Sequence, residues 1–398
     1  MTCCMLGLYE PTIQSEPPLS AECLQFTGDS FQGGHDMADK IRLGLIGASI
    51  QGTWSARAHL PAVQASSEVE LTAVCTTKAD SAEAACRAWG ARLAFDDYRK
   101  MVASPEIDAV AVVVRVPSHY APTKAALEAG KHVYCEWPLG RTTAEAVELS
   151  ALAKAKGLVT AVGLQARVNP ALMYMKEQVE AGFVGEVMAV HVSLIREGVL
   201  SRPSHHTWQR DAELGANTLT IANGHTVDAM RFVTGDFRSL SAVVAIQAKQ
   251  WLDTGTNALL DVTSPDNVLL SGRLASGAIA SVHVGAIPFA GSGYRMEIYG
   301  RDGTLVATSA DSPQLSEVFL QGAKGGNRLA PMPERFKFAA PATSSGEAFN
   351  VGQMYRLFAR AVHDGESRQP TFETAVELHH LIDAIRRASD SGRQVTFE

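Results

Sequence analysis

The stretch that decides the fold is residues 41–52, Ile-Arg-Leu-Gly-Leu-Ile-Gly-Ala-Ser-Ile-Gln-Gly. An apolar run ends at Gly47, and a helical pattern follows from residue 53. The spacing from Gly47 to Gly52 is that of a Gly-x-Gly-x-x-Gly turn, which aims backbone N–H groups at a pyrophosphate. Ser49 stands where the second glycine is usual, so we expect a slightly shifted pyrophosphate. The flanking strand and helix favour a cofactor-binding turn over a merely tight connection.

Short apolar runs alternate with helical patterns as far as residue 163. Strands are predicted at 41–47, 70–75, 108–114, 132–136 and 158–163, and helices at 53–65, 81–89, 121–129 and 143–156. Parallel neighbours need crossover connections, so this alternation predicts a doubly wound parallel sheet. We expect an α/β Rossmann domain over residues 39–165.

The pattern changes after Asn169. A helix at 170–181 leads into longer alternating strands at 187–195, 239–248, 258–262, 267–274, 278–284, 294–299 and 304–307. These predict a second, α+β domain over residues 166–398, with a large, mostly antiparallel open sheet. Residues 322–346 are interpreted as a long surface loop. Two final helices, 351–363 and 374–388, either stay with this domain or pack back on the first.

Composition excludes several classes of protein. The chain has 398 residues, 46% hydrophobic and 19% charged, with a formal charge of -7. There is no basic surplus for nucleic acid and no apolar run long enough to cross a membrane. Residues 1–38 have no Lys or Arg, so they are interpreted as an extension rather than a secretory signal. Six cysteines without a framework favour a reducing, cytoplasmic setting, with Cys75 and Cys135 as buried thiols.

The end of the second predicted strand bears on cofactor choice. An acidic residue there usually binds the ribose hydroxyls and disfavours a 2′-phosphate. This chain has Thr76-Thr77-Lys78 instead. The hydroxyls and the ammonium favour NADP over NAD, unless these are ordinary turn residues.

Residues 128–139, Glu-Ala-Gly-Lys-His-Val-Tyr-Cys-Glu-Trp-Pro-Leu, resemble the Gfo/Idh/MocA dehydrogenases. The resemblance extends to residues 59–62, 116–119, 182–187 and 224–228. It implies a Rossmann domain followed by an α+β domain whose open sheet commonly forms an oligomer interface. A homo-oligomer, dimer or tetramer, is therefore expected through the C-terminal sheet.

Two departures from the family pattern bear on function. Family dehydrogenases usually carry Glu-Lys-Pro, and the lysine helps to move the substrate's hydroxyl proton; here Trp137 stands at that position. Ile221 replaces a usual aspartate four residues before His225. The Glu-Trp-Pro variant resembles a branch that includes the fungal galactose-pathway repressor, which regulates transcription through protein contact. Each lost acid–base group handicaps a simple alcohol dehydrogenase by about 10²- to 10⁴-fold.

The remaining candidates gather around these motifs. His225 matches the family's active-site histidine and is the predicted catalytic residue, with substrate contact as a second role. Glu136 ends a parallel strand where such sheets bind ligands, and either contacts the cofactor or caps a helix. Trp137 is expected to wall the nicotinamide, with core packing as the alternative. The other predicted cofactor-binding residues are Gly47, Ser49, Gly52, Trp54, Thr76, Thr77, Lys78, Val116, Pro117 and His119.

Three further side chains are candidates for binding substrate. Trp208 and Arg210 lie in residues 205–211, which suit stacking and hydrogen bonding to a ring-shaped ligand or form a solvated loop. Arg167 follows the last strand of the first domain. No metal site is expected, because His205 and His206 are adjacent rather than a helical turn apart.

Two functions follow from these patterns. The first is an NAD(P)-dependent oxidoreductase acting on a hydroxyl or carbonyl of a sugar-like or other polar small molecule, including a redox-neutral version that holds its cofactor tightly. The second is a non-catalytic, dinucleotide-binding regulator like the galactose-pathway repressor. The glycine turn favours the enzyme, and the losses at Trp137 and Ile221 favour the regulator.

Overall fold

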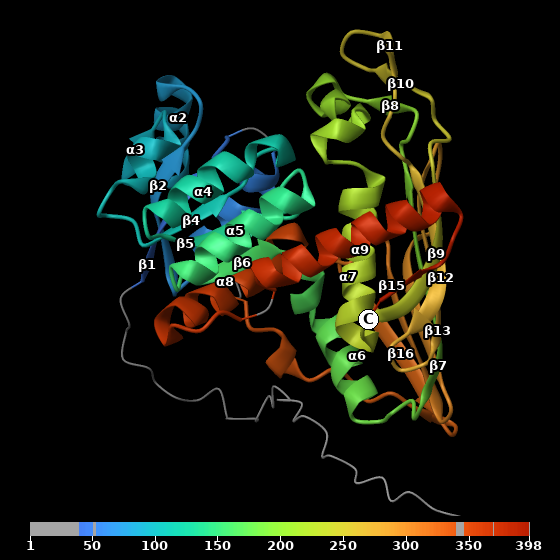
Figure 1. Cartoon of the computed structure of the whole chain (residues 1–398). Coiled ribbons are helices and arrows are strands. Elements are labelled where there is room, and N and C mark those ends of the chain that lie inside the picture. Colours follow the sequence, from blue (N-terminus) through green and yellow to red (C-terminus); the bar gives the residue numbers. More distant parts are fainter. Residues whose placement is uncertain (1–39, 51–52, 340–345, 369, 398) are drawn as a thin grey trace, which may run out of the picture. The chain divides into compact units, whose positions relative to one another are not determined.

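The first sheet is parallel throughout, as the alternation of strands and helices predicted (Figure 1). A computed structural model describes residues 40–50, 53–339, 346–368 and 370–397. The strands run in the order β3-β2-β1-β4-β5-β6. They are β1 (Ile41–Ile46), β2 (Val69–Cys75), β3 (Leu93–Phe95), β4 (Ala109–Val112), β5 (His132–Glu136) and β6 (Thr160–Gly163). The predicted Rossmann architecture is confirmed.

Crossover helices connect these strands. They are α1 (Leu60–Ala65), α2 (Ala79–Trp89), α3 (Tyr98–Val102), α4 (Tyr120–Glu128) and α5 (Thr143–Ala155). The sequence did not reveal β3 and α3, because three and five residues are too short for a periodic signal. The helix expected at 53–65 begins as a π-helical turn, η1 (Ser55–His59), before α1.

The second sheet has nine strands and is mostly antiparallel; within it β7 and β13 pair in parallel. Its order is β17-β16-β15-β14-β7-β13-β12-β9-β18. The strands are β7 (Val187–Glu197), β9 (Phe237–Ala245), β12 (Asn267–Leu274), β13 (Ile279–Ile287), β14 (Gly293–Gly300), β15 (Gly303–Ser309), β16 (Phe319–Lys324), β17 (Asn327–Arg328) and β18 (Val395–Thr396). A small sheet adds β8 (Ser201–Arg202), β10 (Gln250–Asp253) and β11 (Ala258–Asp261).

The prediction of a loop over residues 322–346 is wrong in part. Strand β16 reaches Lys324 and pairs with β17, and a short 3-10 turn, η7 (Glu334–Phe336), follows. Glycine-rich composition misled the prediction, since Gly322 lies in the strand, where a Cβ would stand 2.7 Å from the side chain of Leu305. Residues 340–345 lie outside the described part of the chain.

Three helices lie on one face of the nine-stranded sheet: α6 (Pro170–Glu180), α7 (Asn223–Thr234) and α9 (Phe372–Ser391) (Figure 1). The fourth, α8 (Glu347–Asp364), buries Val351, Tyr355 and Phe358 in a core shared with Leu60 and Val63 of α1. Helix α8 therefore completes the Rossmann core although it comes late in the chain.

The opposite face of the large sheet carries no helix in Figure 1. The strand register aligns a row of outward side chains across it: Phe319, Thr308, Arg295, Ser193, His283, Leu269 and Val243. Phe319, Leu269 and Val243 are 59%, 48% and 59% exposed. We call this surface the outer face.

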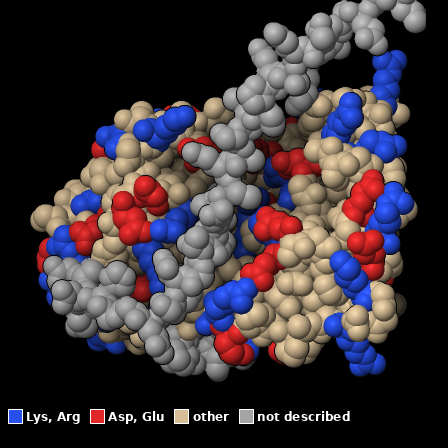
Figure 2. All heavy atoms as spheres, turned by 90° about the horizontal axis from the view of Figure 1, so that it is seen from below, with Lys and Arg blue, Asp and Glu red and all other residues tan. Residues whose placement is uncertain are grey.

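The described surface is mixed in charge. Figure 2 shows Lys and Arg interspersed with Asp and Glu on the side seen from below. Among the described residues, no helix is both long and apolar enough to cross a membrane.

Candidate active site

The turn after β1 is built around Gly47. Its φ is +95°, and a Cβ there would lie 2.1 Å from the carbonyl oxygen of Val113. Its N–H donates to the carbonyl of Cys75 at 2.9 Å, and its carbonyl accepts from Ser55 Oγ at 2.8 Å. Only glycine fits this close approach between β1 and β4. The structure therefore requires glycine at position 47, as the first glycine of such a turn does, and its contact with a pyrophosphate stays a prediction.

Ser49 is accommodated without backbone strain. Among the described non-glycine residues only Asn257 has a positive φ, so the side chain at Ser49 meets no left-handed conformation. Its carbonyl accepts a hydrogen bond from Trp89 Nε1 at 3.1 Å. Trp54, just before η1, has a buried Nε1 without a partner. Gly52 lies outside the described residues.

Thr76, Thr77 and Lys78 lie between β2 and α2. The Thr76 hydroxyl donates to the Lys78 carbonyl at 2.9 Å and lies 2.6 Å from Ser81 Oγ. Thr77 and Lys78 are exposed at the carboxyl edge of the sheet, and Lys78 is the residue before α2. The segment is thus a helix start with one exposed ammonium.

Val116, Pro117 and His119 follow β4. Val116 and Pro117 lie in a 3-10 turn, with Val116 buried and Pro117 exposed. His119 is buried, with Nδ1 2.6 Å from the carbonyl of Pro138 and Nε2 3.0 Å from that of Val114. Burial lowers the pKa of His119, against the two carbonyls, which raise it. The imidazole joins the loops that follow β4 and β5.

Glu136, the last residue of β5, belongs to a buried polar network. Its Oε1 lies 2.9 Å from Nε2 of His59, and Gln165 Nε2 donates to both carboxylate oxygens at 2.9 and 3.1 Å. The other ring nitrogen of His59, Nδ1, lies 2.8 Å from the hydroxyl of Tyr355. Burial raises the pKa of Glu136, but the hydrogen bond and charge of His59 and the bond from Gln165 lower it, and the net shift is downward. The carboxylate is therefore ionised at neutral pH.

Trp137 is a core residue in this structure. It is 4% exposed, its Nε1 donates to the Thr220 carbonyl at 2.9 Å, and its ring lies 4.8 Å from that of His379. A Cβ on Gly224 would stand 2.6 Å from the indole nitrogen. These contacts favour the core-packing alternative over an aromatic wall for the cofactor.

His225 lies in the first turn of α7 and is 5% exposed. Burial lowers its pKa to about 4, although Glu136 and Asp228 act to raise it. Its Nδ1 is buried and has no partner. Nε2 is then the nitrogen that would meet a substrate hydroxyl, and that contact stays a prediction. A neutral imidazole can accept a proton there.

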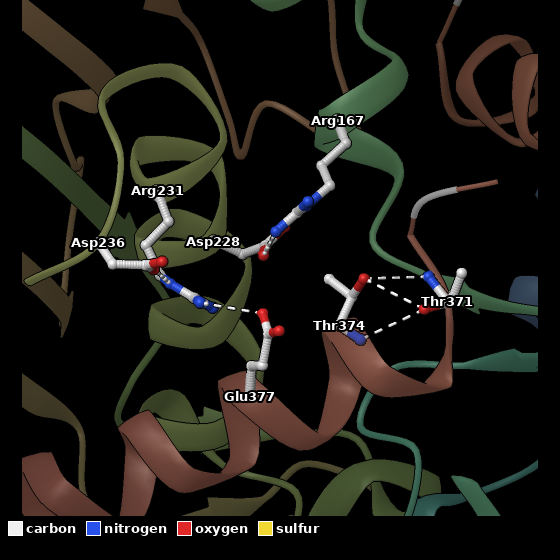
Figure 3. A network of polar contacts seen from close by, with 7 residues as sticks. All are labelled: Arg167, Asp228, Arg231, Asp236, Thr371, Thr374 and Glu377. Atoms are coloured by element: carbon white, nitrogen blue, oxygen red, sulfur yellow. Dashed lines mark hydrogen bonds and ion pairs between the residues drawn. The ribbon is translucent and has the colours of Figure 1, made fainter. Parts of the chain in front are cut away.

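The helix that carries His225 is fixed by buried charge (Figure 3). Arg167, in the turn after β6, donates from Nε and Nη2 to the two oxygens of Asp228 at 2.9 and 2.7 Å. Their side chains are 8% and 0% exposed. This pairing favours a structural role for Arg167, whose predicted contact with substrate stays a prediction.

Figure 3 also shows how α7 is tied to α9. Arg231 of α7 pairs with Asp236 and, at 3.4 Å, with Glu377 of α9. Helix α9 begins in a reciprocal cap, in which Thr371 and Thr374 each accept from the other's backbone N–H. The helix that packs His379 against Trp137 is thereby held in register with the helix that carries His225.

Trp208 lies in the 3-10 segment η4 (Ser204–Arg210) of the second domain. Arg115, just after β4, donates from Nη2 to the carbonyl of His205 at 3.1 Å, and its guanidinium lies 5.4 Å from the Trp208 ring. Trp208 therefore lies beside the carboxyl edge of the Rossmann sheet. Arg210 instead donates to the Asp261 carbonyl at 3.0 Å, towards the small sheet.

A cavity of about 860 Å³ lies at the other end of the strands, lined in part by Lys40, Arg42, Asp108 and Lys131. It is at the amino edge of β1, β4 and β5. Open α/β sheets bind ligands beyond the carboxyl ends of their strands, so this cavity is not the candidate site. The described residues include no group of three His, Cys, Asp or Glu side chains placed to hold a metal.

The two interior thiols behave as the sequence predicted. Cys75 and Cys135 are 2% and 0% exposed, and burial raises the pKa of each to about 12. A protonated thiol is a poor nucleophile, so neither adds reactive chemistry to the site.

Sequence reasoning missed His59, Gln165 and Tyr355 as functional residues. His59 stood inside residues 59–62, which carried part of the family resemblance, so a signal for it existed. Tyr355 had none, because its contact with His59 spans 296 residues of sequence.

Comparison with known proteins covers both domains. Residues 41–164 match a family model described as an oxidoreductase family with an NAD-binding Rossmann fold, and residues 176–397 match that family's C-terminal alpha/beta domain. The dehydrogenase aclE of Aspergillus oryzae is 27% identical over 384 residues, covering 91% of this chain and 99% of the relative. The GAL80 regulatory protein of Kluyveromyces lactis is 27% identical over 260 residues, covering 60% and 56%.

Solved structures agree in fold. Levoglucosan dehydrogenase in complex with NADH and levoglucosan has a TM-score of 0.76 at 21% identity, covering 90% of this chain and 99% of that one. A super-repressor mutant of Gal80p from Saccharomyces cerevisiae has a TM-score of 0.79 at 21% identity, covering 90% and 98%. One architecture therefore includes both a dehydrogenase and a regulator.

Proposed function

This chain belongs to the Gfo/Idh/MocA oxidoreductase family, and on that premise we propose that it is an NAD(P)-dependent oxidoreductase acting on a hydroxyl or carbonyl of a sugar-like or other polar small molecule. The observation that carries the proposal is His225, a buried imidazole whose pKa is lowered to about 4 by burial, while the nearby Glu136 carboxylate acts to raise it. Glu136 ends β5 and Gly47 follows β1, so both lie at the carboxyl edge of the same parallel sheet. The proposed cofactor turn and the carboxylate near His225 thus share one edge.

The residues divide the work as follows. The Gly47 turn binds the pyrophosphate, and bound NAD(P) supplies hydride exchange with the substrate carbon. His225 takes or returns the hydroxyl proton at Nε2, in place of the lysine that the family usually carries. Trp208 offers a partly buried ring for stacking on a sugar face. Levoglucosan dehydrogenase, 26% identical over 333 residues with 77% and 83% coverage, is a relative with a sugar-derived substrate.

Turnover tests this proposal. Purified protein is mixed with NADPH or NADH and a panel of aldehydes, ketones and sugars, and absorbance of the reduced cofactor is followed. We expect substrate-dependent oxidation that falls about 10²- to 10⁴-fold in His225→Ala. His363→Ala, an exposed histidine at the end of α8, is the matched control. Full activity in His225→Ala would contradict the assigned role.

We propose NADP as the preferred form of the cofactor. The exposed Lys78 and the hydroxyl of Thr76 stand at the end of β2, and β2 itself ends without a carboxylate, although Asp80 lies in the first turn of α2 and Asp96 and Asp97 follow the neighbouring β3. Lys78→Glu is expected to lower the NADPH-to-NADH affinity ratio about tenfold, because a charge-assisted bond becomes a repulsion. Fluorescence titration measures the ratio, with Lys154→Glu on the exposed end of α5 as control. An unchanged ratio would favour NAD.

We also propose that the chain forms a homo-oligomer through its outer face. Phe319, Leu269 and Val243 leave apolar area exposed across strands β16, β12 and β9, and Ile279 of β13 adds to it. Exposed large apolar side chains on a sheet face that carries no helix are typical of an interaction site, although polar side chains lie between Phe319 and Leu269 here. Light scattering should give at least a dimer at micromolar concentration. A monomer would contradict this part of the proposal.

The second candidate is a dinucleotide-binding regulator. Trp137 fills the family lysine position with a buried indole rather than a proton donor, and GAL80 proteins share the architecture. A regulator would bind NAD(P)H as tightly as an enzyme but show no substrate-dependent absorbance change across the panel. The turnover experiment therefore separates the two candidates.

A further inference from the structure

We propose that His59 and Tyr355 are positioning residues for the Glu136 carboxylate, so that helix α8 sets the geometry of the Rossmann sheet's ligand-binding edge. This inference rests on the proposed function in one respect, that Glu136 lies beside bound cofactor or substrate. Its structural part concerns only residues of this chain. Neither the glycine turn nor His225 implies the positioning roles of His59 and Tyr355.

The hydrogen bonds join the three side chains in series. An ionised carboxylate only accepts, so His59 donates from Nε2 to Glu136 Oε1 at 2.9 Å. The remaining nitrogen, Nδ1, lies 2.8 Å from the Tyr355 hydroxyl, which donates to a neutral imidazole and accepts from a charged one. The chain of bonds therefore runs from the phenol of α8, through His59 of η1, to the carboxylate of β5. Each group fixes the orientation of the next.

The network is closed at its far end. His59 and Tyr355 are both 0% exposed, and Tyr134 stacks on Tyr355 with ring centroids 5.2 Å apart. Burial raises the pKa of Tyr355 well above its usual value. These buried rings provide no hydrogen-bonded path along which a proton could pass from His59 to solvent. The network therefore holds the carboxylate still rather than relaying protons to solvent.

The carboxylate itself is fitted into the sheet edge. A Cβ on Gly163 of β6 would stand 2.5 Å from Oε1, so only glycine leaves room for the group there. Gln165 Nε2 donates to Oε2 at 3.1 Å, and Glu136 retains 8% exposure. A carboxylate oxygen accepts more than one hydrogen bond, so Oε2 has capacity for a donor on the cofactor or substrate. His59 donates to the other oxygen, Oε1, which also accepts from Gln165, and Tyr355 reaches the carboxylate only through His59.

Three variants separate positioning from packing. His59→Gln keeps an N–H donor for Glu136, His59→Leu removes it, and Tyr355→Phe removes only the hydroxyl that orients the ring. Tyr294→Phe is the control, because Tyr294 is an equally buried phenol in the large sheet, bonded to Met296 Sδ at 3.4 Å. Circular dichroism establishes that each variant folds.

The first readout is cofactor affinity, measured by NADPH fluorescence between pH 4.5 and 8. We expect about tenfold weaker binding in His59→Leu, a smaller loss in Tyr355→Phe and His59→Gln, and none in Tyr294→Phe. The acid limb of the affinity profile should move to higher pH in His59→Leu, since the carboxylate loses the bond that favours its charge. Unchanged affinity and an unchanged acid limb in a folded His59→Leu would overturn the proposal.

The second readout needs no ligand. Glutamate carboxyl carbons are labelled with ¹³C, Glu136 is assigned with Glu136→Gln, and its titration is followed in the free protein. A higher carboxyl pKa in His59→Leu, or in Tyr355→Phe if the first variant does not fold, supports positioning. An unchanged titration in the folded variants refutes it. If the native protein binds no cofactor, the proposed function fails while this readout still decides the inference.

Discussion

The carboxyl edge of the Rossmann sheet and the outer face of the nine-stranded sheet treat polar side chains in opposite ways. At the edge, Glu136, His59, Gln165 and Tyr355 are buried and bond to one another. On the outer face, serine, histidine and apolar side chains alternate across seven strands and stay partly exposed.

The two regions differ in how strictly the fold constrains their side chains. A buried polar group without a partner is costly, so the edge requires a full set of bonds and tolerates few changes. The outer face keeps its groups near water and can accept substitutions, provided no partner covers it. We therefore expect the same kind of mutation to have unequal effects in the two regions.

The largest contrast should come from breaking equivalent ion pairs. Arg167→Met leaves Asp228 buried without its partner, and we expect a loss of about 3 to 5 kcal/mol in unfolding free energy. Arg301→Met breaks an exposed pair between Arg301 and Glu186, whose side chains are 64% and 67% exposed, and should cost far less, because solvent screens the pair. Urea unfolding measures both. Equal losses of unfolding free energy in the two variants would contradict the expected effect of burial on the ion pair.

A smaller contrast concerns pH. Burial lowers the pKa of His225 and of His379 to about 4 each, below the usual 6.5. Between these values the unfolded chain binds protons that the folded chain does not, so unfolding free energy falls as pH falls. The slope is at most about 1.4 kcal/mol per pH unit for each histidine.

Urea unfolding at pH 7.5, 6.0 and 5.0 measures this slope. His379→Gln should remove its share, and His191→Gln on the outer face serves as the control, since His191 is exposed and bonds to Ser281 at 2.8 Å. A slope that is the same in His379→Gln as in the native chain would contradict burial as the cause.

The smallest effect on stability is expected on the outer face. Phe319→Arg should change unfolding free energy by no more than about 0.5 kcal/mol when measured on the monomer, because the ring is 59% exposed. The same change should weaken self-association, since it places a charge in the proposed interface. Sedimentation at several concentrations checks this, with Arg328→Glu on the short edge strand β17 as control. Unaltered association would remove the outer face as the interface.

The sequence predicted the architecture because local periodicity carries it. The alternation of short strands and helices and the Gly47 turn needed no long-range information, and both sheets followed. Short elements such as β3 were not predicted. The strand around Gly322 was predicted as part of a loop, because its composition favoured one. In each case, pairing with a neighbouring strand overrides a weak local preference.

The candidate site was only partly predictable, for a different reason. His225 and Glu136 were found from motif position, and their roles stay predictions. Trp137 was expected beside the cofactor, but its contacts with Gly224 and His379 become visible only when α7 and α9 are packed. No sequence signal pointed to Tyr355, because a tyrosine on the apolar face of an amphipathic helix looks like an ordinary core residue.

The contact between His59 and Tyr355 also sets an order of events during synthesis. A chain still on the ribosome can complete β1 to β6 long before α8 emerges, since β6 ends at Gly163 and α8 begins at Glu347. Until then His59 lacks the hydroxyl that orients it, and Val351 and Phe358 are missing from the Rossmann core. N-terminal domains generally fold first during synthesis. In this chain the core of the Rossmann domain is complete only after α8 has been made, near the end of translation. Chains released before α8 is made therefore contain every cofactor-binding motif, but not the hydroxyl that orients the imidazole at the ligand-binding edge.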